Sequence, residues 1–266
     1  MSIDRQPKAD HVAAVLKVFA VLETLAEEKR ASLADIAQKA MTSKSTAHRL
    51  LQTMVDLGYV EQEAETEKYY PTLKLFSLGA RTLSGQSDLL HAADRAMGRL
   101  SRATGESINL GVMDERDQRV AYIHKYDSAY NLSMQSPLGK RNPLHSTSLG
   151  KALMAWRDQE EIEERLAKME FVKLAPKTIT DAEIYRQQLA EIRTRGYAEE
   201  IEESEAGVRC MAVPVFDHMG KTIAAISISF PLFRFDEVRK PEYVSLLMNA
   251  GREASAGLGY VGETRE

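Results

Sequence analysis

The sequence lacks several features that would place it in familiar classes of protein. Its single cysteine, Cys210, excludes an internal disulfide bond and fits a reducing compartment. No apolar stretch is long enough to span a bilayer, because residues 12–26 include Lys17 and Glu23 and "TIAAISISFPLF" is too short. No signal peptide is recognisable. These absences predict a soluble protein of the cytoplasm that does not contact a membrane.

Motifs for enzyme chemistry are also scarce. The six histidines show no metal-ligand spacing, and the chain has no phosphate-binding loop or nucleophile elbow. Cys210 has no histidine close in sequence that could act as its base. The sequence therefore predicts a protein that is not an enzyme and uses no metal or other cofactor. A cysteine-dependent enzyme remains as an alternative.

The composition of the chain is that of a globular protein, and its charges are unevenly distributed. The 266 residues are 44% hydrophobic and 28% charged, which is enough for one large core or two smaller ones. The net charge of −4 gives no general attraction to nucleic acid. Segment 36–55, however, contains no acidic residue, whereas five of the seven residues 199–205 are glutamate. The acid-free segment is therefore the candidate for contact with an anion.

The acid-free segment lies within a pattern of short helices that is typical of DNA-binding proteins. Helical spacing from residue 12, followed by "SLADIAQKA" with Ser32 and Asp35 as a capping box, predicts two helices. After the turn "MTS", Ser43 is a good N-cap for a third helix. "GYVEQEAETEKYYPT" then predicts two short strands. This order of elements is that of a winged helix-turn-helix. The inward residues predicted for the third helix are Ala47, Leu50, Leu51 and Met54.

The opposite face of this third helix has the side chains that a DNA-reading helix needs. Donors at its start can meet phosphate, and an arginine further along can bond guanine in the major groove. The alternative is an ordinary solvated helix with a good cap. The hairpin after it has four glutamates and only Lys68 opposing them, so we expect its tip to stay away from phosphate. The predicted DNA-binding residues are Ser43, Lys44, Ser45, Thr46, His48 and Arg49.

The character of the sequence changes after Gly85. "TLKLFSLGARTLSG" predicts a helix with apolar residues on two faces, which we expect to link two domains and pack on another subunit. Helices follow at 89–105, 148–157, 158–169, 181–195 (opened by Thr180) and 240–257, with strand-like runs at 106–113, 119–126, 131–136, 208–216 and 222–230. This pattern predicts an α+β domain with an antiparallel sheet flanked by helices. The expected organisation is a flexible tail (1–9), a winged helix-turn-helix domain (10–71), a linker helix (72–86) and a second domain (87–262).

A second candidate site begins at "RNPLHSTSLGKALMAW". Free amides at the start of a helix near Ser148 and Leu149 can hold a carboxylate, with Gly150 keeping the first turn open. Arg141 and Lys151 are expected to add positive charge. The alternative is a plain N-cap with no ligand.

Polar residues in two later strands could complete a cavity. Ser227 and Ser229 alternate with apolar residues, so both point to one face, and Cys210 lies on a possible neighbouring strand. A glutamate of segment 199–205, if turned inward, could accept hydrogen bonds from a polyol. The alternatives are a solvent-facing edge strand for the serines, an inert buried cysteine and a solvated glutamate run.

Taken together, the motifs resemble the IclR family of transcriptional regulators over nearly the whole chain. Those that carry the resemblance are "SLADIAQKA", "SKSTAHRLLQTMVDLGYV", "TLKLFSLGA", "NPLHSTSLGKALMAW", "GVRCMAVPVFD" and "AAISISF". The resemblance implies a winged helix-turn-helix, a linker helix and a GAF-like domain that binds a small organic acid. It also implies homodimers that pair into tetramers on double-stranded DNA with a palindromic operator.

The resemblance further implies which residues bind the effector. It places the effector carboxylate at Ser148 and Leu149. Asn131 replaces an apolar residue of the family and Ser148 a glycine, which favours a hydroxylated sugar acid over pyruvate or glyoxylate. The remaining positions that it assigns to the pocket are Met134, Glu200, Val208, Cys210, Ser227 and Ser229.

Within the family, the likeness is greatest to repressors of pectin and hexuronate catabolism. It predicts a repressor that 2-keto-3-deoxygluconate releases from DNA. Alternatives are an activator, a regulator that responds to an aromatic or short keto acid, and an enzyme that uses Cys210 on a sugar acid.

Overall fold

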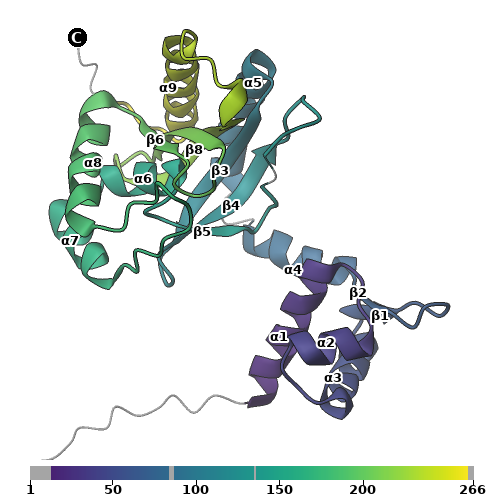
Figure 1. Cartoon of the computed structure of the whole chain (residues 1–266). Coiled ribbons are helices and arrows are strands. Elements are labelled where there is room, and N and C mark those ends of the chain that lie inside the picture. The colour runs from purple at the N-terminus through teal and green to yellow at the C-terminus, as the bar shows by residue number, and fades with distance from the viewer. Residues whose placement is uncertain (1–12, 84–86, 135, 263–266) are drawn as a thin grey trace, which may run out of the picture. The chain divides into compact units, whose positions relative to one another are not determined.

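The computed structural model describes residues 13–83, 87–134 and 136–262, so the predicted tail at 1–9 lies outside the described residues. Contacts along the chain divide it into two compact units, Met1–Gly85 and Gln86–Glu266. This boundary falls inside the linker predicted at 72–86. Figure 1 labels the elements of both units, which are described separately below.

The first unit has the predicted winged helix-turn-helix. Its elements are α1 (Ala13–Glu28), α2 (Leu33–Lys39), α3 (Lys44–Asp56), β1 (Val60–Gln62), β2 (Tyr69–Pro71) and α4 (Leu73–Leu83). Strands β1 and β2 pair antiparallel as a hairpin. The predicted caps are present, because Ser32 accepts a hydrogen bond from the amide of Asp35 and Ser43 one from the amide of Thr46.

The core of this unit confirms the inward face expected for α3. Ala47, Leu51 and Met54 are buried and Leu50 is partly buried, as their helical spacing requires. They lie in a unit whose core also includes Leu25 of α1 and residues of α2 and the hairpin. The opposite face of α3 is therefore left for solvent or a partner.

The second unit is the predicted α+β domain. Its six-stranded antiparallel sheet has the order β5-β4-β3-β8-β7-β6. The strands are β3 (Ser107–Asp114), β4 (Arg119–Tyr126), β5 (Arg141–Pro143), β6 (Ala198–Ile201), β7 (Val208–Phe216) and β8 (Thr222–Pro231). The helices are α5 (Ser87–Thr104), α6 (Ser148–Ala155), α7 (Gln159–Lys168), α8 (Ala182–Arg195) and α9 (Lys240–Gly257).

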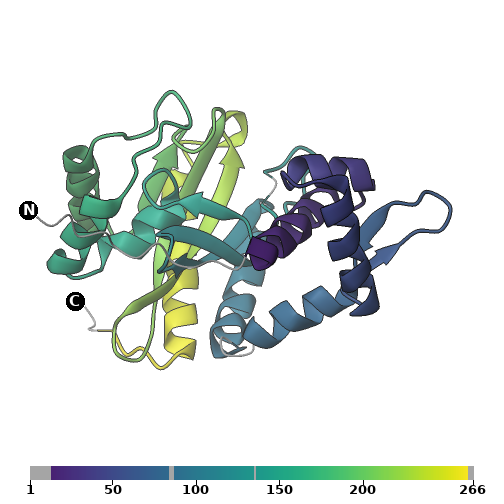
Figure 2. The same cartoon turned by 90° about the horizontal axis from the view of Figure 1, so that it is seen from below.

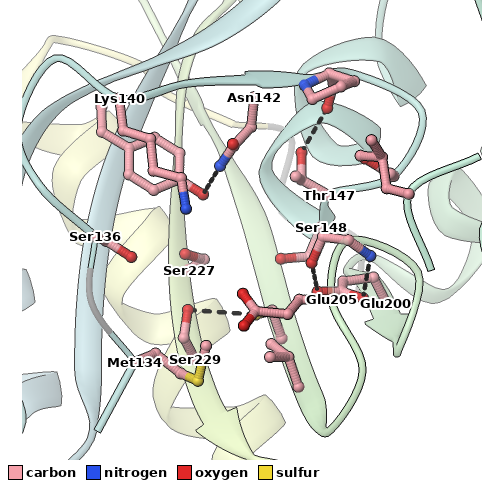
Figure 3. A pocket seen from close by; sticks show the side chains of 17 residues that line it. Met134, Ser136, Lys140, Asn142, Thr147, Ser148, Glu200, Glu205, Ser227 and Ser229 are labelled. Carbon is pink, nitrogen blue, oxygen red and sulfur yellow. Dashed lines mark hydrogen bonds between the residues drawn. The ribbon is translucent and has the colours of Figure 1, made fainter. Parts of the chain in front are cut away.

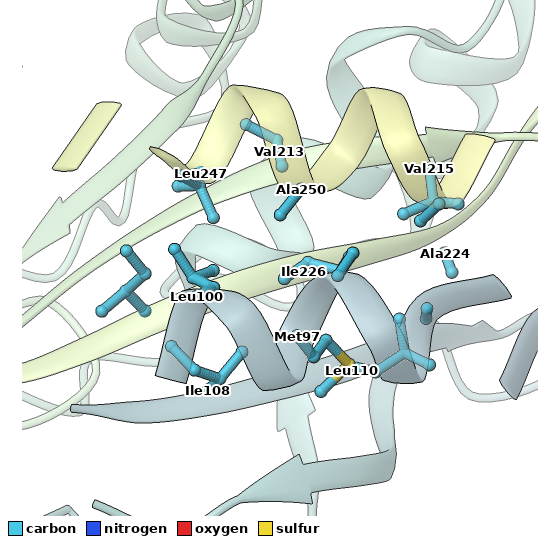
Figure 4. Packing of buried hydrophobic residues seen from close by; sticks show 14 of the residues in the cluster. Met97, Leu100, Ile108, Leu110, Val213, Val215, Ala224, Ile226, Leu247 and Ala250 are labelled. Atoms are coloured by element: carbon cyan, nitrogen blue, oxygen red, sulfur yellow. The ribbon is translucent and has the colours of Figure 1, made fainter. Parts of the chain in front are cut away.

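Helices cover both faces of the sheet, which divides the hydrophobic residues into two clusters. On one face α5 and α9 lie side by side (Figure 1 and Figure 2) and pack Met97 and Leu247 against strand residues such as Ile226 (Figure 4). On the other face α6 and α8 form the second cluster. Since side chains alternate along a strand, Ile226 and Ile228 face α5 and α9, and Ser227 and Ser229 face α6.

Two local expectations were wrong. The run 131–136 forms no strand at its described residues, and β5 pairs with β4 instead. The N-cap of α8 is Asp181 and not Thr180, because the Asp181 carboxylate accepts hydrogen bonds from the amides of Glu183 and Ile184 at 2.8 and 3.0 Å. A carboxylate at this position also interacts favourably with the positive end of the helix.

No helix among the described residues combines the length and apolar character needed to cross a membrane. The described part of the chain also contains no group of histidine, cysteine, aspartate and glutamate side chains arranged to hold a metal ion.

Candidate functional site

The predicted DNA-binding residues all lie on the first two turns of α3 or at its cap. Lys44, Ser45, His48 and Arg49 are exposed, and Thr46 is half-buried. Within the described ranges, the side chains of Lys44, His48 and Arg49 make no hydrogen bond or ion pair, so their donors are available. This face has the composition that contact with phosphates and base edges requires.

Three of the predicted DNA-binding hydroxyls are already used at the start of the helix, because Ser45 Oγ lies 3.1 Å from Ser43 Oγ and bonds to it. Ser43 Oγ accepts from the Thr46 amide at 3.2 Å and donates to Thr46 Oγ1 at 2.9 Å. The side chains of Ser43 and Thr46 therefore stabilise the start of α3, together with Ser45, and Lys44, His48 and Arg49 are left with the greater freedom to meet DNA.

The acidic wing is partly tied to its own domain. The Tyr70 hydroxyl donates to Glu61 at 2.6 Å, and Glu63 forms an ion pair with Arg30. The Arg30 guanidinium also lies 5.1 Å from the centre of the Tyr70 ring. That the wing tip avoids phosphate stays a prediction.

The second domain contains a cavity between the sheet and the start of α6 (Figure 3). Its volume is about 80 Å³, which is smaller than the range of about 300–1,000 Å³ typical of small-molecule sites. Of the predicted effector residues it brings together Met134, Ser148, Glu200, Val208, Cys210, Ser227 and Ser229. Residues that sequence reasoning did not assign to it include Tyr122, Ser136, Lys140, Asn142, Ser146, Thr147, Ser204 and Glu205.

The floor of the cavity is a polar row that crosses four strands. Glu200 pairs with Cys210, Cys210 with Ser229, and Ser229 with Ser107. Directly paired residues share a face of the sheet, so this register gathers polar side chains from distant parts of the sequence. The edge-strand alternative for the two serines is wrong, because β8 lies between β3 and β7 and both serines are buried.

Hydrogen bonds set the polarity of this floor. Ser229 Oγ accepts from Asn109 Nδ2 and from Cys210 Sγ, each at 3.3 Å, so its own hydrogen is free to donate to a ligand. The Glu200 carboxylate accepts from Ser204 Oγ at 2.7 Å and from the Glu203 amide at 3.0 Å, and burial raises its pKa. Asn109 escaped the sequence analysis, although an asparagine within the apolar run "SINLGV" was a signal that could have found it.

Cys210 is placed for packing and hydrogen bonding more than for nucleophilic attack. Burial, reinforced by the charge of Glu200, raises the pKa of its thiol. Its S–H donates to Ser229. Burial and the charge of Glu200 keep the sulfur protonated, whereas a nucleophilic cysteine needs surroundings that favour the thiolate.

The start of α6 forms a wall of the cavity and has unpaired donors. The N-cap is Thr147, which accepts from the Gly150 amide at 3.0 Å. The amides of Ser148 and Leu149 precede any intrahelical partner and are free for a carboxylate. Ser146 Oγ is fully buried, lines the cavity and has no hydrogen-bond partner among the described residues.

Gly150 is required where α6 begins. A Cβ atom on this residue would lie 2.2 Å from the carbonyl oxygen of Leu144. Because that neighbour is backbone, no side-chain rotation can relieve the overlap. The close approach holds the first turn of α6 against segment 143–147 and so fixes the free amides in place.

The positive charge expected from Arg141 and Lys151 is not available to a ligand. Arg141 is paired with Asp114 and Asp117. Lys151 is fully buried, and its Nζ donates to both carboxylate oxygens of Glu203, at 2.6 and 2.7 Å. That expectation was therefore wrong.

Two predicted effector residues lie outside the cavity wall. The side chain of Leu149 is buried in the core under α6, so only its amide can serve the site. Asn131 is exposed and does not line the cavity. The polarity of Asn131 therefore gives no support to the preference for a sugar acid.

Comparison with known proteins matches both domains of the chain. Residues 14–64 match the "IclR helix-turn-helix domain" and residues 80–256 match "Bacterial transcriptional regulator IclR C-terminal". The chain is 51% identical over 258 residues to the HTH-type transcriptional regulator KdgR of Escherichia coli, covering 97% of this chain and 96% of that protein. It is also 51% identical over 258 residues to KdgR of Dickeya chrysanthemi, covering 97% of this chain and 83% of that protein.

Solved structures share the fold. The Thermotoga maritima IclR structure matches with a TM-score of 0.80 and 31% identity, covering 94% of this chain and all (100%) of that chain. The C-terminal domain of E. coli KdgR matches with a TM-score of 0.59 and 47% identity, covering 65% of this chain and 99% of that chain. With its helix-turn-helix and effector domain both matched, the chain belongs to the IclR family of bacterial transcriptional regulators.

Proposed function

We propose that this regulator is a repressor of genes for pectin and hexuronate catabolism and that 2-keto-3-deoxygluconate releases it from DNA. The observation that carries the proposal is the 51% identity to two KdgR proteins over 97% of the chain. The polarity of the cavity adds to it, because a hydroxylated keto acid needs both anion-binding amides and hydroxyl partners. As a DNA-binding regulator, the chain would act in the cytoplasm.

The cavity offers a partner for each kind of group on such an acid. The free amides of Ser148 and Leu149 suit the carboxylate. Glu200 can accept hydrogen bonds from ligand hydroxyls, and Ser229 can donate to a ligand oxygen. Met134 and Val208 supply apolar wall, while Cys210 and Ser227 complete the floor.

On the DNA side, we propose that Lys44, Ser45, His48 and Arg49 contact the operator, with Ser43 and Thr46 fixing the start of the helix. Exposed apolar side chains on α1 and α4, including Phe19, Leu73 and Phe76, support association with a second copy. A two-fold dimer would place two recognition helices on a palindromic operator, and two such dimers would form the tetramer.

Release would follow from a shift in population. One arrangement of the subunits fits successive half-sites of the operator, and a second arrangement does not. The effector must bind the second arrangement more tightly than the first. For nearly complete release, this difference in binding free energy must be several kcal/mol. By linkage, operator DNA must then weaken effector binding by the same factor. Equal effector affinity for free and operator-bound protein would contradict this mechanism.

The direct test is selection of genomic fragments by the purified protein at moderate salt, with and without 2-keto-3-deoxygluconate. Enrichment of palindromic sites beside sugar-acid genes, abolished by the ligand, is the expected result. Enrichment that this ligand leaves unchanged would keep the DNA-reading helix and reject the effector. A panel of aromatic and short keto acids would then identify the class of acid that releases DNA.

A further inference from the structure

One cation at the mouth of the cavity is left unpaired. Lys140 lines the cavity and forms no ion pair within the part of the chain that the structure describes, in contrast to its neighbour Arg141 and to Lys151. Its backbone is fixed beside β4, because the Tyr122 amide donates to the Lys140 carbonyl at 3.0 Å and the Gly139 amide to the Tyr122 carbonyl at 2.8 Å. The position of this lysine is therefore set by the sheet, even though its side chain is exposed.

The Lys140 ammonium is directed toward the cavity. Burial raises the pKa of the Cys210 thiol on the floor, and the charge of Lys140 opposes that rise. Figure 3 shows Lys140 and Asn142 across the cavity from Glu200 and Ser148. A ligand held at the start of α6 would therefore extend toward this lysine.

Two further donors lie beside Lys140. The Tyr122 hydroxyl accepts a hydrogen bond from Asn142 Nδ2 at 3.1 Å, which leaves the tyrosine hydrogen free to donate. Burial raises the pKa of Tyr122, so the phenol keeps that hydrogen. Asn142 has a second hydrogen on the same nitrogen. Tyr122, Lys140 and Asn142, here called the donor wall, thus present hydrogen-bond donors from β4, β5 and the turn between them.

We propose that the donor wall binds the hydroxylated end of the effector and makes the cavity select long polyhydroxylated acids over short keto acids. This inference rests on the proposed function, since it assumes that the carboxylate occupies the start of α6. Hydroxyls at the far end of the ligand can accept from the donor wall, and a hydroxyl nearer to α6 can donate to Glu200 on the opposite side. No residue of the donor wall was assigned to the effector site from the sequence.

The basis of the selection is the cost of unpaired donors. A short acid such as pyruvate would fill the α6 end and leave the donor wall without partners except water. Tyr122 is buried and Asn142 is half-buried, and sites with buried polar groups discriminate against ligands that cannot pair with those groups. A longer acid with several hydroxyls gains the hydrogen bonds, including the charge-assisted ones from Lys140.

The test uses the full chain and isothermal titration with 2-keto-3-deoxygluconate and with pyruvate. The variants are Lys140→Met, Asn142→Ala and Tyr122→Phe, and the matched control is Lys221→Met, an exposed lysine in the β7–β8 hairpin. Lys140→Met should weaken binding of the sugar acid about tenfold or more, as for loss of a charged hydrogen bond, and binding of pyruvate less than about twofold. Tyr122→Phe should weaken the sugar acid about fivefold. Lys221→Met should leave both affinities unchanged.

Two results would overturn the donor wall. One is an affinity of Lys140→Met for the sugar acid that stays within about twofold of the unmodified protein; the other is an equal loss for both acids, which would assign Lys140 to the carboxylate. Failure of the unmodified protein to bind 2-keto-3-deoxygluconate would instead reject the proposed effector. Titration of the same variants with gluconate and galacturonate would then test whether the donor wall binds hydroxylated acids, independently of the proposed effector. Binding of aromatic acids alone would reject both the proposed effector and the donor wall.

Discussion

Helices α3 and α6 begin in the same way and lie in opposite surroundings. Each is opened by a hydroxyl residue, Ser43 or Thr147, that accepts a hydrogen bond from the amide three positions later. The first two residues of α3 are exposed, whereas every residue of α6 is buried. Both helix starts leave amides free. Burial thus decides whether those amides can meet a DNA backbone or only a small molecule that fits a cavity.

The two helices also differ in how they accommodate charge. On α3, Lys44 and Arg49 reach solvent and need no partner. On α6, Lys151 is enclosed and forms an ion pair with Glu203, which lies on the connection between β6 and β7. The cations of α3 are thus exposed and available to a partner, whereas Lys151 of α6 is a structural element.

Of the variants that test this contrast, Gly150→Ala should have the largest effect on stability. The added Cβ would overlap the Leu144 backbone, so the free energy of unfolding should fall by about 3 kcal/mol or more. The control is Lys44→Ala at the exposed start of α3, which should change the free energy of unfolding by about 0.5 kcal/mol or less. Urea unfolding measures both. Similar losses for the two variants would contradict the contrast drawn between the helices.

Arg49→Ala should act on DNA binding and leave the effector domain intact. If Arg49 contacts a base, specific binding should weaken by about 1–3 kcal/mol while the affinity for the effector stays unchanged. Fluorescence anisotropy with operator and random duplexes measures the change. A loss of equal size on both duplexes would assign Arg49 to phosphate contact instead.

Removal of the two N-caps should cost different amounts. Ser43→Ala should lower stability by about 1 kcal/mol, the usual value for a cap. Thr147→Ala should cost about 2 kcal/mol, because Thr147 is buried and its Oγ1 also donates to the carbonyl of half-buried Pro143 at 3.1 Å. Thermal unfolding compares them, with Thr147→Ser as the variant that keeps the hydroxyl. A larger loss of stability in Ser43→Ala than in Thr147→Ala would show that burial of α6 does not increase the stabilisation contributed by its N-cap.

The smallest effect is a pH dependence at Glu200. Burial raises the pKa of this carboxyl above its ordinary 4.5, so its contribution to stability declines as the pH rises from 4.5 through the folded-state pKa. Glu200→Gln removes this decline. The melting temperature of the variant, relative to that of the unmodified protein, should therefore increase as the pH rises from 5 to 8. The same variant should weaken effector binding and spare DNA binding.

Glu202→Gln provides a control of opposite sign. The Lys177 ammonium, by a hydrogen bond, lowers the pKa of the Glu202 carboxyl, so this group stabilises the fold increasingly as the pH rises through that pKa. Its replacement should not improve the relative melting temperature at higher pH. Parallel behaviour of the two variants would reject the assignment of the effect to burial of Glu200.

The sequence predicted most elements of both domains because local signals determine them, but it missed the short strands β5 and β6. The caps at Ser32 and Ser43 and the inward stripe of α3 depend only on neighbouring residues. The shared face of Ser227 and Ser229 follows from the period of a strand. The order of the strands is not local, and it is this order that places β8 in the interior of the sheet and buries both serines.

Register and ion pairing explain what the sequence could not show. Lys140 and Arg141 are adjacent, and only the pairing of β5 with β4 decides which of them reaches the cavity. The run 131–136 has the alternation of a strand, yet its backbone is used differently, because the Met134 carbonyl accepts from Ser107 Oγ at 3.2 Å. Asn109 is conspicuous as a polar residue in an apolar run, but its hydrogen-bond partner Ser229 is set only once β3 and β8 are paired.

The buried pair of Lys151 and Glu203 bears on how such a regulator could acquire a new effector in evolution. Loss of either partner would leave a buried charge unpaired, at a cost of about 3–5 kcal/mol, so this side of the cavity resists change by single substitutions. Lys140 and Asn142 lie at the β5 edge of the sheet with no such coupling. Adaptation to a different acid would therefore start at that edge, while the first turn of α6, where we propose that the carboxylate binds, would be inherited unchanged.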